Sequence, residues 1–253
     1  IKEIAELKER YGIDFFYFSD DMFGLNKRWM EEWFKSKRML DKDLGRIPYG
    51  CQTRADVATE DLIGNLKESG CIQLDVGVES GDQEVLDKVN KKISIQQIRQ
   101  TFEWCRKYRL RAFGTLMVNM PGETEGSIGK TKSFLKEIRP CGVAVSVCTP
   151  YPGTQIYDEY VMPRLRKEEY HLLQDASMKG QAGFRMAAHG LALRKLRNRL
   201  GRKFKVLPMF ERMWTANPLY WKTVACSGHK FAYALAWIVD LPKTFLSYWR
   251  HRF

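Results

Sequence analysis

The sequence predicts an α/β fold, a partial (β/α) barrel that is followed by a helical, basic C-terminal extension. Up to about residue 160, short aromatic or β-branched runs alternate with segments of helical periodicity. Such alternation is typical of parallel β-α units with right-handed crossovers. The five strands expected are too few for a closed (β/α)8 barrel, so an open, partial barrel fits better.

The first half of the core shows these elements in order. A helical stripe of Ile and Leu begins at Ile1 and ends at Gly12, a glycine typical of a helix C-terminus. The aromatic run 13–18 predicts a buried strand. Apolar residues then recur at helical spacing over 29–40, and 47–54 is the next extended segment.

The second half of the core follows the same pattern. Thr59 is a candidate N-cap of a helix that ends at Gly70, and Ser94 opens a capping box. Gly126 and Gly129 weaken the helix expected at 125–138. The remaining strands are expected at residues 71–78, 112–120 and 142–148.

Charge divides the chain into an expected core, 1–163, and an expected helical region, 164–253. The chain carries a net charge of +12, and the second region alone has 18 Lys and Arg against 5 Asp and Glu. This asymmetry suggests contact with nucleic acid, an anionic membrane surface or a partner protein; a solvated set of helices is the alternative reading. The apolar run Phe231 to Val239 is too short to span a membrane, although contact at its surface fits.

The six cysteines are scattered and show no close pairing such as C-x-x-C. Several lie in apolar surroundings, where reduced, buried thiols are usual, so we expect a cytoplasmic protein. The chain opens at Ile1 in the middle of a helical pattern and without a signal peptide, so we expect it to be N-terminally truncated.

Polar, glycine-punctuated segments follow the expected strands. Taken singly they resemble helix caps and turns. Because parallel strands place their carboxyl ends on one rim, where α/β folds bind ligands, we expect them to gather there. These segments are Ser19-Asp20-Asp21, Arg54-Ala55-Asp56, Glu79-Ser80-Gly81, Asn119-Met120-Pro121-Gly122-Glu123-Thr124 and Tyr151-Pro152-Gly153.

The chemistry of this rim suits a particular class of ligand. Carboxylates bind an ammonium group or ribose hydroxyls, Arg clamps a carboxylate, and glycines let the backbone approach a base. The chain has neither a P-loop nor a G-x-G-x-x-G motif, so phosphate cradling is unsupported. S-adenosylmethionine (SAM) carries an ammonium, a carboxylate, a ribose and an adenine but no phosphate, and it fits this inventory.

In order and spacing, these motifs resemble the radical SAM superfamily over about residues 1–160. The resemblance is closest to the branch whose members usually carry a cobalamin-binding domain, such as the anaerobic magnesium-protoporphyrin monomethyl ester cyclase. It rests on Phe15-Phe16-Tyr17-Phe18-Ser19-Asp20-Asp21-Met22-Phe23, Thr53-Arg54-Ala55-Asp56, Gly77-Val78-Glu79-Ser80-Gly81, Pro121-Gly122-Glu123-Thr124 and Pro150-Tyr151-Pro152-Gly153-Thr154.

The resemblance implies roles for the rim residues. Ser19, Asp20 and Asp21 stand in the motif that holds the SAM amino group. Glu79 and Ser80 stand where the family contacts the ribose or the methionine moiety of SAM.

Arg54 is a candidate clamp for a carboxylate of SAM or of the substrate, and an ion pair with Asp56 or Asp75 is the alternative. The adenine side of the site is expected to be lined by four further residues. They are Asn119, Met120, Pro121 and Tyr151.

The chain departs from the family at its cluster motif. The family holds a [4Fe–4S] cluster with a C-x-x-x-C-x-x-C loop after its first strand, and no cysteines here have that spacing. We therefore expect the loop upstream of Ile1, together with any cobalamin domain, and this chain alone to be inactive. A homologue that has lost its cluster is the alternative.

The implied activity is reductive cleavage of SAM that starts a methyl transfer or an oxidative cyclisation, with cobalamin where that domain is present. The expected partners are an electron donor and a small-molecule or lipid-like substrate, with peripheral membrane contact through the basic tail and nucleic acid less favoured. Two rivals stay open. One is a non-catalytic binding scaffold, and the other is an RNA-modifying enzyme of the methylthiotransferase type.

Overall fold

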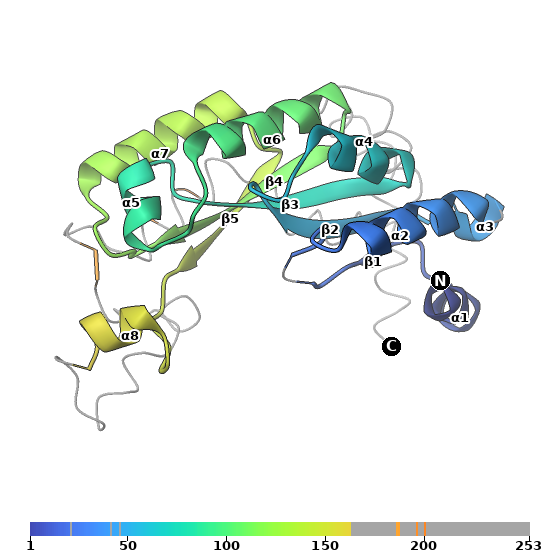
Figure 1. Ribbon diagram of the computed structural model, residues 1–253, viewed down its shortest axis with the longest axis horizontal. Helices are drawn as coiled ribbons and strands as arrows, with labels where there is room; N and C mark the ends of the chain where they lie inside the picture. Colours follow the sequence, from blue (N-terminus) through green and yellow to red (C-terminus); the bar gives the residue numbers. More distant parts are fainter. Residues whose placement is uncertain are drawn as a thin grey trace, which may run out of the picture.

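The computed structural model describes residues 1–20, 22–40, 42–45, 47–162, 186, 187, 196 and 200. The α/β core lies in these residues, and Figure 1 draws the remaining ones as a thin grey trace. Apart from residues 186, 187, 196 and 200, the expected helical region 164–253 lies outside the described residues. The division of the chain at residue 163 therefore stays a prediction.

Five parallel strands form one sheet in which chain order and spatial order coincide, β1-β2-β3-β4-β5. This arrangement confirms the predicted partial barrel, because every crossover joins neighbouring parallel strands through at least one helix. The strands are β1 (Phe16–Tyr17), β2 (Tyr49–Arg54), β3 (Cys71–Glu79), β4 (Arg111–Val118) and β5 (Gly142–Val147).

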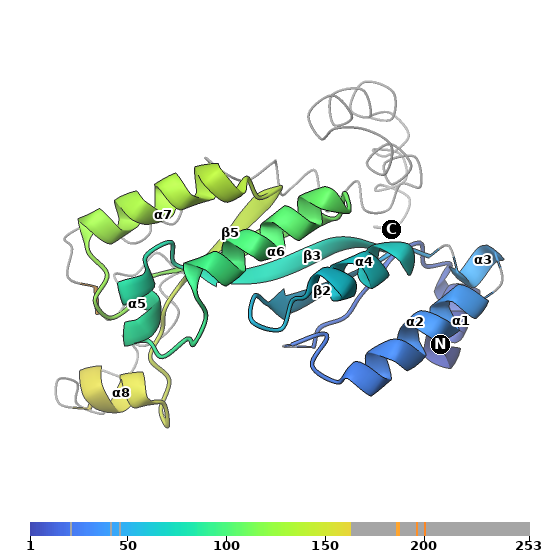
Figure 2. The ribbon, with the colours of Figure 1, turned by 45° about the horizontal axis from the view of Figure 1, so that its top comes forward.

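Helices α2, α4, α6 and α7 lie over one face of the sheet, and Figures 1 and 2 show α4, α6 and α7 side by side above it. Helices α1 and α3 contact each other near the N-terminus, and α8 follows β5. The helices of the described part are α1 (Lys2–Tyr11), α2 (Lys27–Met39), α3 (Lys42–Gly45), α4 (Glu60–Glu68), α5 (Gln83–Lys88), α6 (Ile95–Lys107), α7 (Glu125–Ile138) and α8 (Gln155–Tyr160).

The main core lies between the sheet and these helices. Alternate residues of β3, Leu74, Val76 and Val78, are fully buried and belong to the same apolar cluster as Ile63 of α4 and Phe102 of α6. Because strand side chains alternate between the two faces, the intervening residues of β3 lie on the face opposite these helices. That second face is where polar strand residues are found.

The predicted helix ends are largely confirmed. Gly12 ends α1 in the left-handed conformation, and the Thr59 hydroxyl accepts from the backbone N–H of Leu62 at the start of α4. Ser94 and Gln97 form the expected capping box of α6. The strand predicted at 13–18 is shorter, because only Phe16–Tyr17 pairs with β2.

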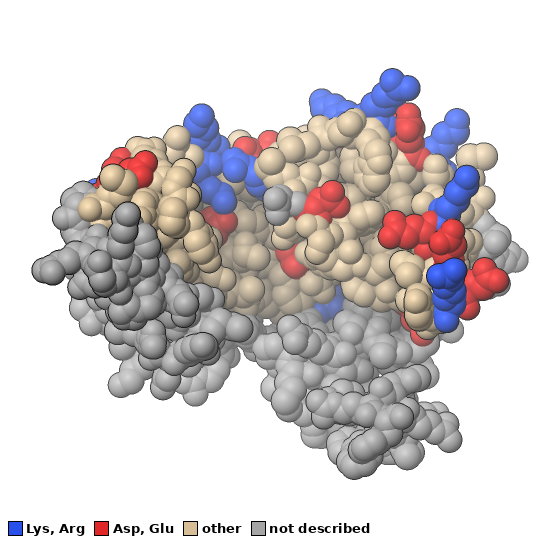
Figure 3. Space-filling model, turned by 90° about the horizontal axis from the view of Figure 1, so that it is seen from below, with Lys and Arg blue, Asp and Glu red and all other residues tan. Residues whose placement is uncertain are grey.

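The face without these covering helices is the one seen from below in Figure 3. The part of it that is not grey is mainly uncharged, with a few acidic side chains on it and most Lys and Arg along its margin. Within the described residues, no helix has the length and apolar character needed to cross a membrane.

Candidate functional site

The carboxyl ends of β3 and β4 depart from regular strand geometry. Glu79 ends β3 with φ 57° and Asn119 follows β4 with φ 73°, both in the left-handed region that non-glycine residues seldom adopt. The pairing of β3 with β4 also shifts register between Gly77 and Glu79. Backbone strain of this kind concentrates at functional sites, where the surrounding structure stabilises it.

The Glu79 side chain is held over the polar face by Lys91. The Lys91 Nζ lies 2.7 Å from Glu79 Oε1, and the Glu79 side chain is only 11% exposed. The carboxylate lies close to Gly77, where a Cβ would be at van der Waals distance, 3.4 Å, from Glu79 Oε1. Lys91 comes from the connection between α5 and α6, which carries no motif, and sequence reasoning missed it.

Arg54, at the end of β2, lies beside this pair. Its guanidinium donates to both carboxylate oxygens of Asp56, at 2.9 and 2.8 Å, and to the Lys91 carbonyl at 3.0 Å. The hydrogen bonds from Arg54 lower the pKa of Asp56. Of the two ion-pair partners considered for Arg54, Asp56 is the one that the structure shows. Since one nitrogen also contacts the Lys91 backbone, the guanidinium still borders the Glu79–Lys91 pair.

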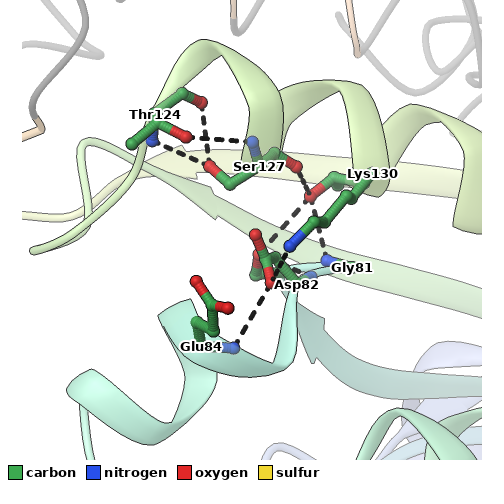
Figure 4. A network of polar contacts seen from close by, with 8 residues as sticks. Gly81, Asp82, Glu84, Thr124, Ser127 and Lys130 are labelled. Atoms are coloured by element: carbon green, nitrogen blue, oxygen red, sulfur yellow. Dashed lines mark hydrogen bonds and ion pairs between the residues drawn. The ribbon is translucent and has the colours of Figure 1, made fainter.

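The Ser80 side chain points toward helix α7. The Ser80 hydroxyl lies 3.4 Å from that of Thr131 on α7 and accepts from the Asp82 N–H at 3.2 Å, while the Gly81 N–H donates to Thr131 Oγ1 at 2.9 Å. Figure 4 shows the surroundings of Gly81 and Asp82, where Lys130 of α7 pairs with Asp82 at 3.0 Å. The contacts bind the turn after β3 to α7, which fixes the position of the neighbouring Glu79.

The segment after β4 meets the end of β5. The Asn119 Nδ2 donates to the Cys148 carbonyl at 3.1 Å, and the Met120 N–H donates to Glu123 Oε2 at 3.1 Å. Met120, Pro121 and Glu123 are buried. Burial, followed by the charges of Glu79 and Glu123, raises the pKa of the Cys148 thiol to about 11.

The other predicted site residues are less closely associated with this cluster. Ser19 and Asp20 are exposed after β1, and Asp21 lies outside the described residues. Tyr151, beyond β5, is 63% exposed. The structure thus brings Arg54 and Glu79 together with Lys91, and joins Asn119 to Cys148. Ser80 is turned toward α7.

A second polar group lies farther back on the same face of the sheet. The Tyr17 hydroxyl donates to Asp75 Oδ2 at 2.8 Å, and Gln73 Nε2 donates to Asp75 Oδ1 at 3.1 Å. Tyr17 reaches across β2 over Gly50, where a Cβ would lie only 2.7 Å from its ring. Burial raises the pKa of Asp75. The sequence analysis named Asp75 only as a candidate ion-pair partner of Arg54. It did not predict this group, because the group depends on the pairing of three strands.

The carboxyl edge fits a ligand that has both an ammonium and a carboxylate. Glu79 is an acceptor for an ammonium or a hydroxyl, while Lys91 and Arg54 are donors for a carboxylate. The described cysteines do not fit an iron–sulfur cluster. Cys51 and Cys71 lie 3.9 Å apart, but both are buried in the main core, and no three metal-binding side chains gather in the described part.

Comparison with known proteins identifies the family of this chain. The radical SAM superfamily matches residues 1–135. An uncharacterized methyltransferase of Pyrococcus horikoshii is 30% identical over 158 residues, which cover 62% of this chain and 34% of that protein. The anaerobic magnesium-protoporphyrin IX monomethyl ester cyclase of Rubrivivax gelatinosus is 22% identical, over 63% of this chain and 28% of the enzyme. The chain thus spans about a third of the length of these relatives.

Solved structures of radical SAM enzymes share the fold. The radical SAM methyltransferase TsrM from Kitasatospora setae, solved with cobalamin and a [4Fe–4S] cluster bound, superposes with a TM-score of 0.57. The match covers 63% of this chain and 30% of TsrM, at 18% sequence identity. At this identity the similarity supports the partial-barrel fold alone.

Proposed function

This chain belongs to the radical SAM superfamily, and from that premise we propose that it supplies most of the SAM-binding core of a methyl-transferring enzyme. The chemistry that the cofactors supply in this family is reductive cleavage of SAM with a [4Fe–4S] cluster. We assign to this chain the binding and orientation of SAM, which the residues at the carboxyl edge of the sheet would perform.

The observation that carries this proposal is the ion pair between Glu79 and Lys91. Glu79 is the last residue of β3 and has a left-handed backbone conformation. Lys91, helped by the neighbouring Arg54, would bind the SAM carboxylate, and Glu79 would accept a hydrogen bond from the ammonium or a ribose hydroxyl. The two groups neutralise each other in the absence of a ligand. A zwitterionic amino acid moiety can therefore insert without leaving a buried charge unpaired.

Methyl transfer is the reaction that the relatives support best. The Pyrococcus horikoshii relative is named as a methyltransferase. TsrM, a methyltransferase with bound cobalamin, shares the fold only. We extend this to a cobalamin-dependent methyl transfer onto a small-molecule or lipid-like substrate, with an external electron donor. Oxidative cyclisation is the second candidate, because the Rubrivivax gelatinosus relative is named as a cyclase.

The test begins with anaerobic reconstitution of the protein, as encoded in full, with iron, sulfide and reductant. We expect SAM to be consumed, with 5′-deoxyadenosine or S-adenosylhomocysteine as the product. The absence of SAM turnover and of both products would overturn the proposal and favour the non-catalytic scaffold.

A matched pair of variants tests the assignment of Lys91. Loss of a charge-assisted hydrogen bond predicts that Lys91→Met weakens SAM binding by about tenfold or more, as measured by equilibrium dialysis. Lys92 is adjacent and exposed, so Lys92→Met controls for changes in the loop. Equal affinity in the two variants would remove Lys91 from the site.

A further inference from the structure

Two residues from beyond the α/β core lie against the carboxyl edge of β4. The backbone N–H groups of Met186 and Ala187 donate to Asn119 Oδ1, at 2.8 and 3.3 Å. The chain separation is 67 residues for the first bond and 68 for the second. Both donors belong to residues that are 7% exposed.

The Asn119 side chain is engaged at both ends of its amide. Its oxygen accepts from two backbone N–H groups, and one N–H of its Nδ2 donates to the Cys148 carbonyl. The residue is 1% exposed, so a ligand has little access to its amide. Asn119 can therefore affect a ligand mainly through the groups that it holds in place.

Met186 covers the space between the ends of β4 and β5. Its side chain belongs to a small buried cluster with Val85, Met120 and Cys148. Cys148 is 8% exposed, and its backbone N–H donates to the Val118 carbonyl at the end of β4. Strand β4 in turn pairs with the end of β3 that carries Glu79.

Two further residues from beyond the α/β core also pack against it. Leu196 and Leu200 are buried in a separate apolar cluster with Val118, Ile128 and Val147. Val118 and Val147 are the last residues of β4 and β5. Leu196 and Leu200 thus pack against the ends of β4 and β5. The backbone of Met186 and Ala187 is hydrogen-bonded to Asn119 at the same end of β4.

We propose that Met186 and Ala187 form a wall of the SAM site and that Asn119 is the positioning residue that holds this wall against the carboxyl edge of the sheet. The inference rests on the proposed function for the identity of the ligand, whereas the contact itself does not. The wall would exclude water from the edge that Met120 and Cys148 share, where the resemblance to the family places the adenine side.

Cys148 provides a chemical probe of this contact in the full chain. Its rate of alkylation by iodoacetamide is measured by peptide mass spectrometry, with and without SAM, in the wild type and in Asn119→Gly. Glycine tolerates the positive φ of this position, so the variant removes the amide without adding backbone strain. Met186→Ala is the second variant, because it uncovers Cys148 while leaving both backbone donors in place.

We expect both variants to raise the alkylation rate of Cys148 by about tenfold, since local opening becomes easier when two hydrogen bonds or a covering side chain are lost. Cys141, partly exposed just before β5 begins, should keep its rate and serves as an internal control. We also expect SAM to slow the alkylation of Cys148 in the wild type and to protect it less in Asn119→Gly.

The outcomes separate the contact from the proposed function. An unchanged alkylation rate of Cys148 in both variants would overturn the inference. It would not bear on the proposed function. Faster alkylation with equal SAM protection in wild type and Asn119→Gly would show that the two residues cover Cys148 without lining the SAM site, which also overturns the wall. In a third outcome, alkylation is faster in the variants but SAM protects Cys148 neither in the wild type nor in the variants. This would count against SAM binding at this edge, and so against both the proposed function and the wall.

Discussion

Gly81 lies so close to helix α7 that the packing leaves no room for a side chain. A Cβ on Gly81 would lie 2.6 Å from the Thr131 Cα and 2.9 Å from the Phe134 Cβ. The Thr131 Cα is backbone, so relief requires α7 to move. The same approach lets the Gly81 N–H donate to Thr131 Oγ1 and fixes the turn that carries Glu79.

We therefore predict that Gly81→Ala destabilises the chain by about 1–3 kcal/mol, the usual cost of overpacking. The matched control is Gly129→Ala in α7, where a Cβ would meet no atom within 4 Å. Because alanine favours helices, that change should stabilise the chain by about 0.5–1 kcal/mol. Urea unfolding midpoints measure both effects. A Gly81→Ala midpoint at or above that of the wild type would contradict the packing argument.

At the scale of elements, predictability from the sequence depended on whether the signal was local. Helix α7 occupies the predicted 125–138, because Thr124 and Ser127 cap it and Gly129 faces open space. Strand β1 was predicted too long, because an aromatic run indicates burial without saying how many residues pair. Short helices such as α5 carry too few residues for a periodic pattern, and the sequence indicated none there.

The candidate site shows the same limit. Arg54 and Glu79 could be named as candidates from the sequence because they lie at the ends of recognisable strands. Lys91 was missed, because its partner is 12 residues away and nothing in its loop indicates that it turns toward the sheet. The contact between Asn119 and Met186 joins residues 67 apart, and no local pattern encodes such a contact.

Helix α2 holds the short helix α3 through one buried cation. The Lys37 Nζ donates to the carbonyls of Leu44, Gly45 and Ile47 at 3.1, 3.1 and 2.8 Å, and the residue is 3% exposed. Lys37→Met keeps the length of the apolar stem but removes all three hydrogen bonds. We predict a loss of about 1–3 kcal/mol in the free energy of unfolding, measured by urea denaturation.

The same side chain predicts a pH dependence. Burial lowers the pKa of Lys37 from its ordinary 10.5 to about 8. Between these two values the unfolded chain binds a proton that the native chain lacks, so native stability rises with pH across that window. The difference in unfolding free energy between wild type and Lys37→Met should therefore grow from about pH 8 to about pH 10. A difference that stays constant or shrinks would contradict the assignment.

At the scale of the whole molecule, the described core and the region after it differ in charge. The core covers one face of its sheet with helices and leaves polar strand residues on the other. Residues 1–163 carry 24 Lys and Arg against 25 Asp and Glu, so the net charge of +12 comes from residues 164–253. We therefore expect long-range electrostatic attraction to an anionic surface to act mainly through that region.

We propose that residues 164–253 bind anionic membrane surfaces, which would suit a lipid-like substrate. The full chain should co-sediment with vesicles that contain phosphatidylserine and much less with neutral phosphatidylcholine vesicles. Raising the salt from about 0.1 M to about 1 M shortens the Debye length from about 10 Å to about 3 Å, so it should release the protein. Replacing Arg194, Lys195, Arg197 and Arg199 by Gln should weaken binding, whereas Gln at Lys2, Lys8, Arg10 and Lys27 of the core should not. Equal binding to both kinds of vesicle, or binding that resists salt, would exclude this electrostatic role.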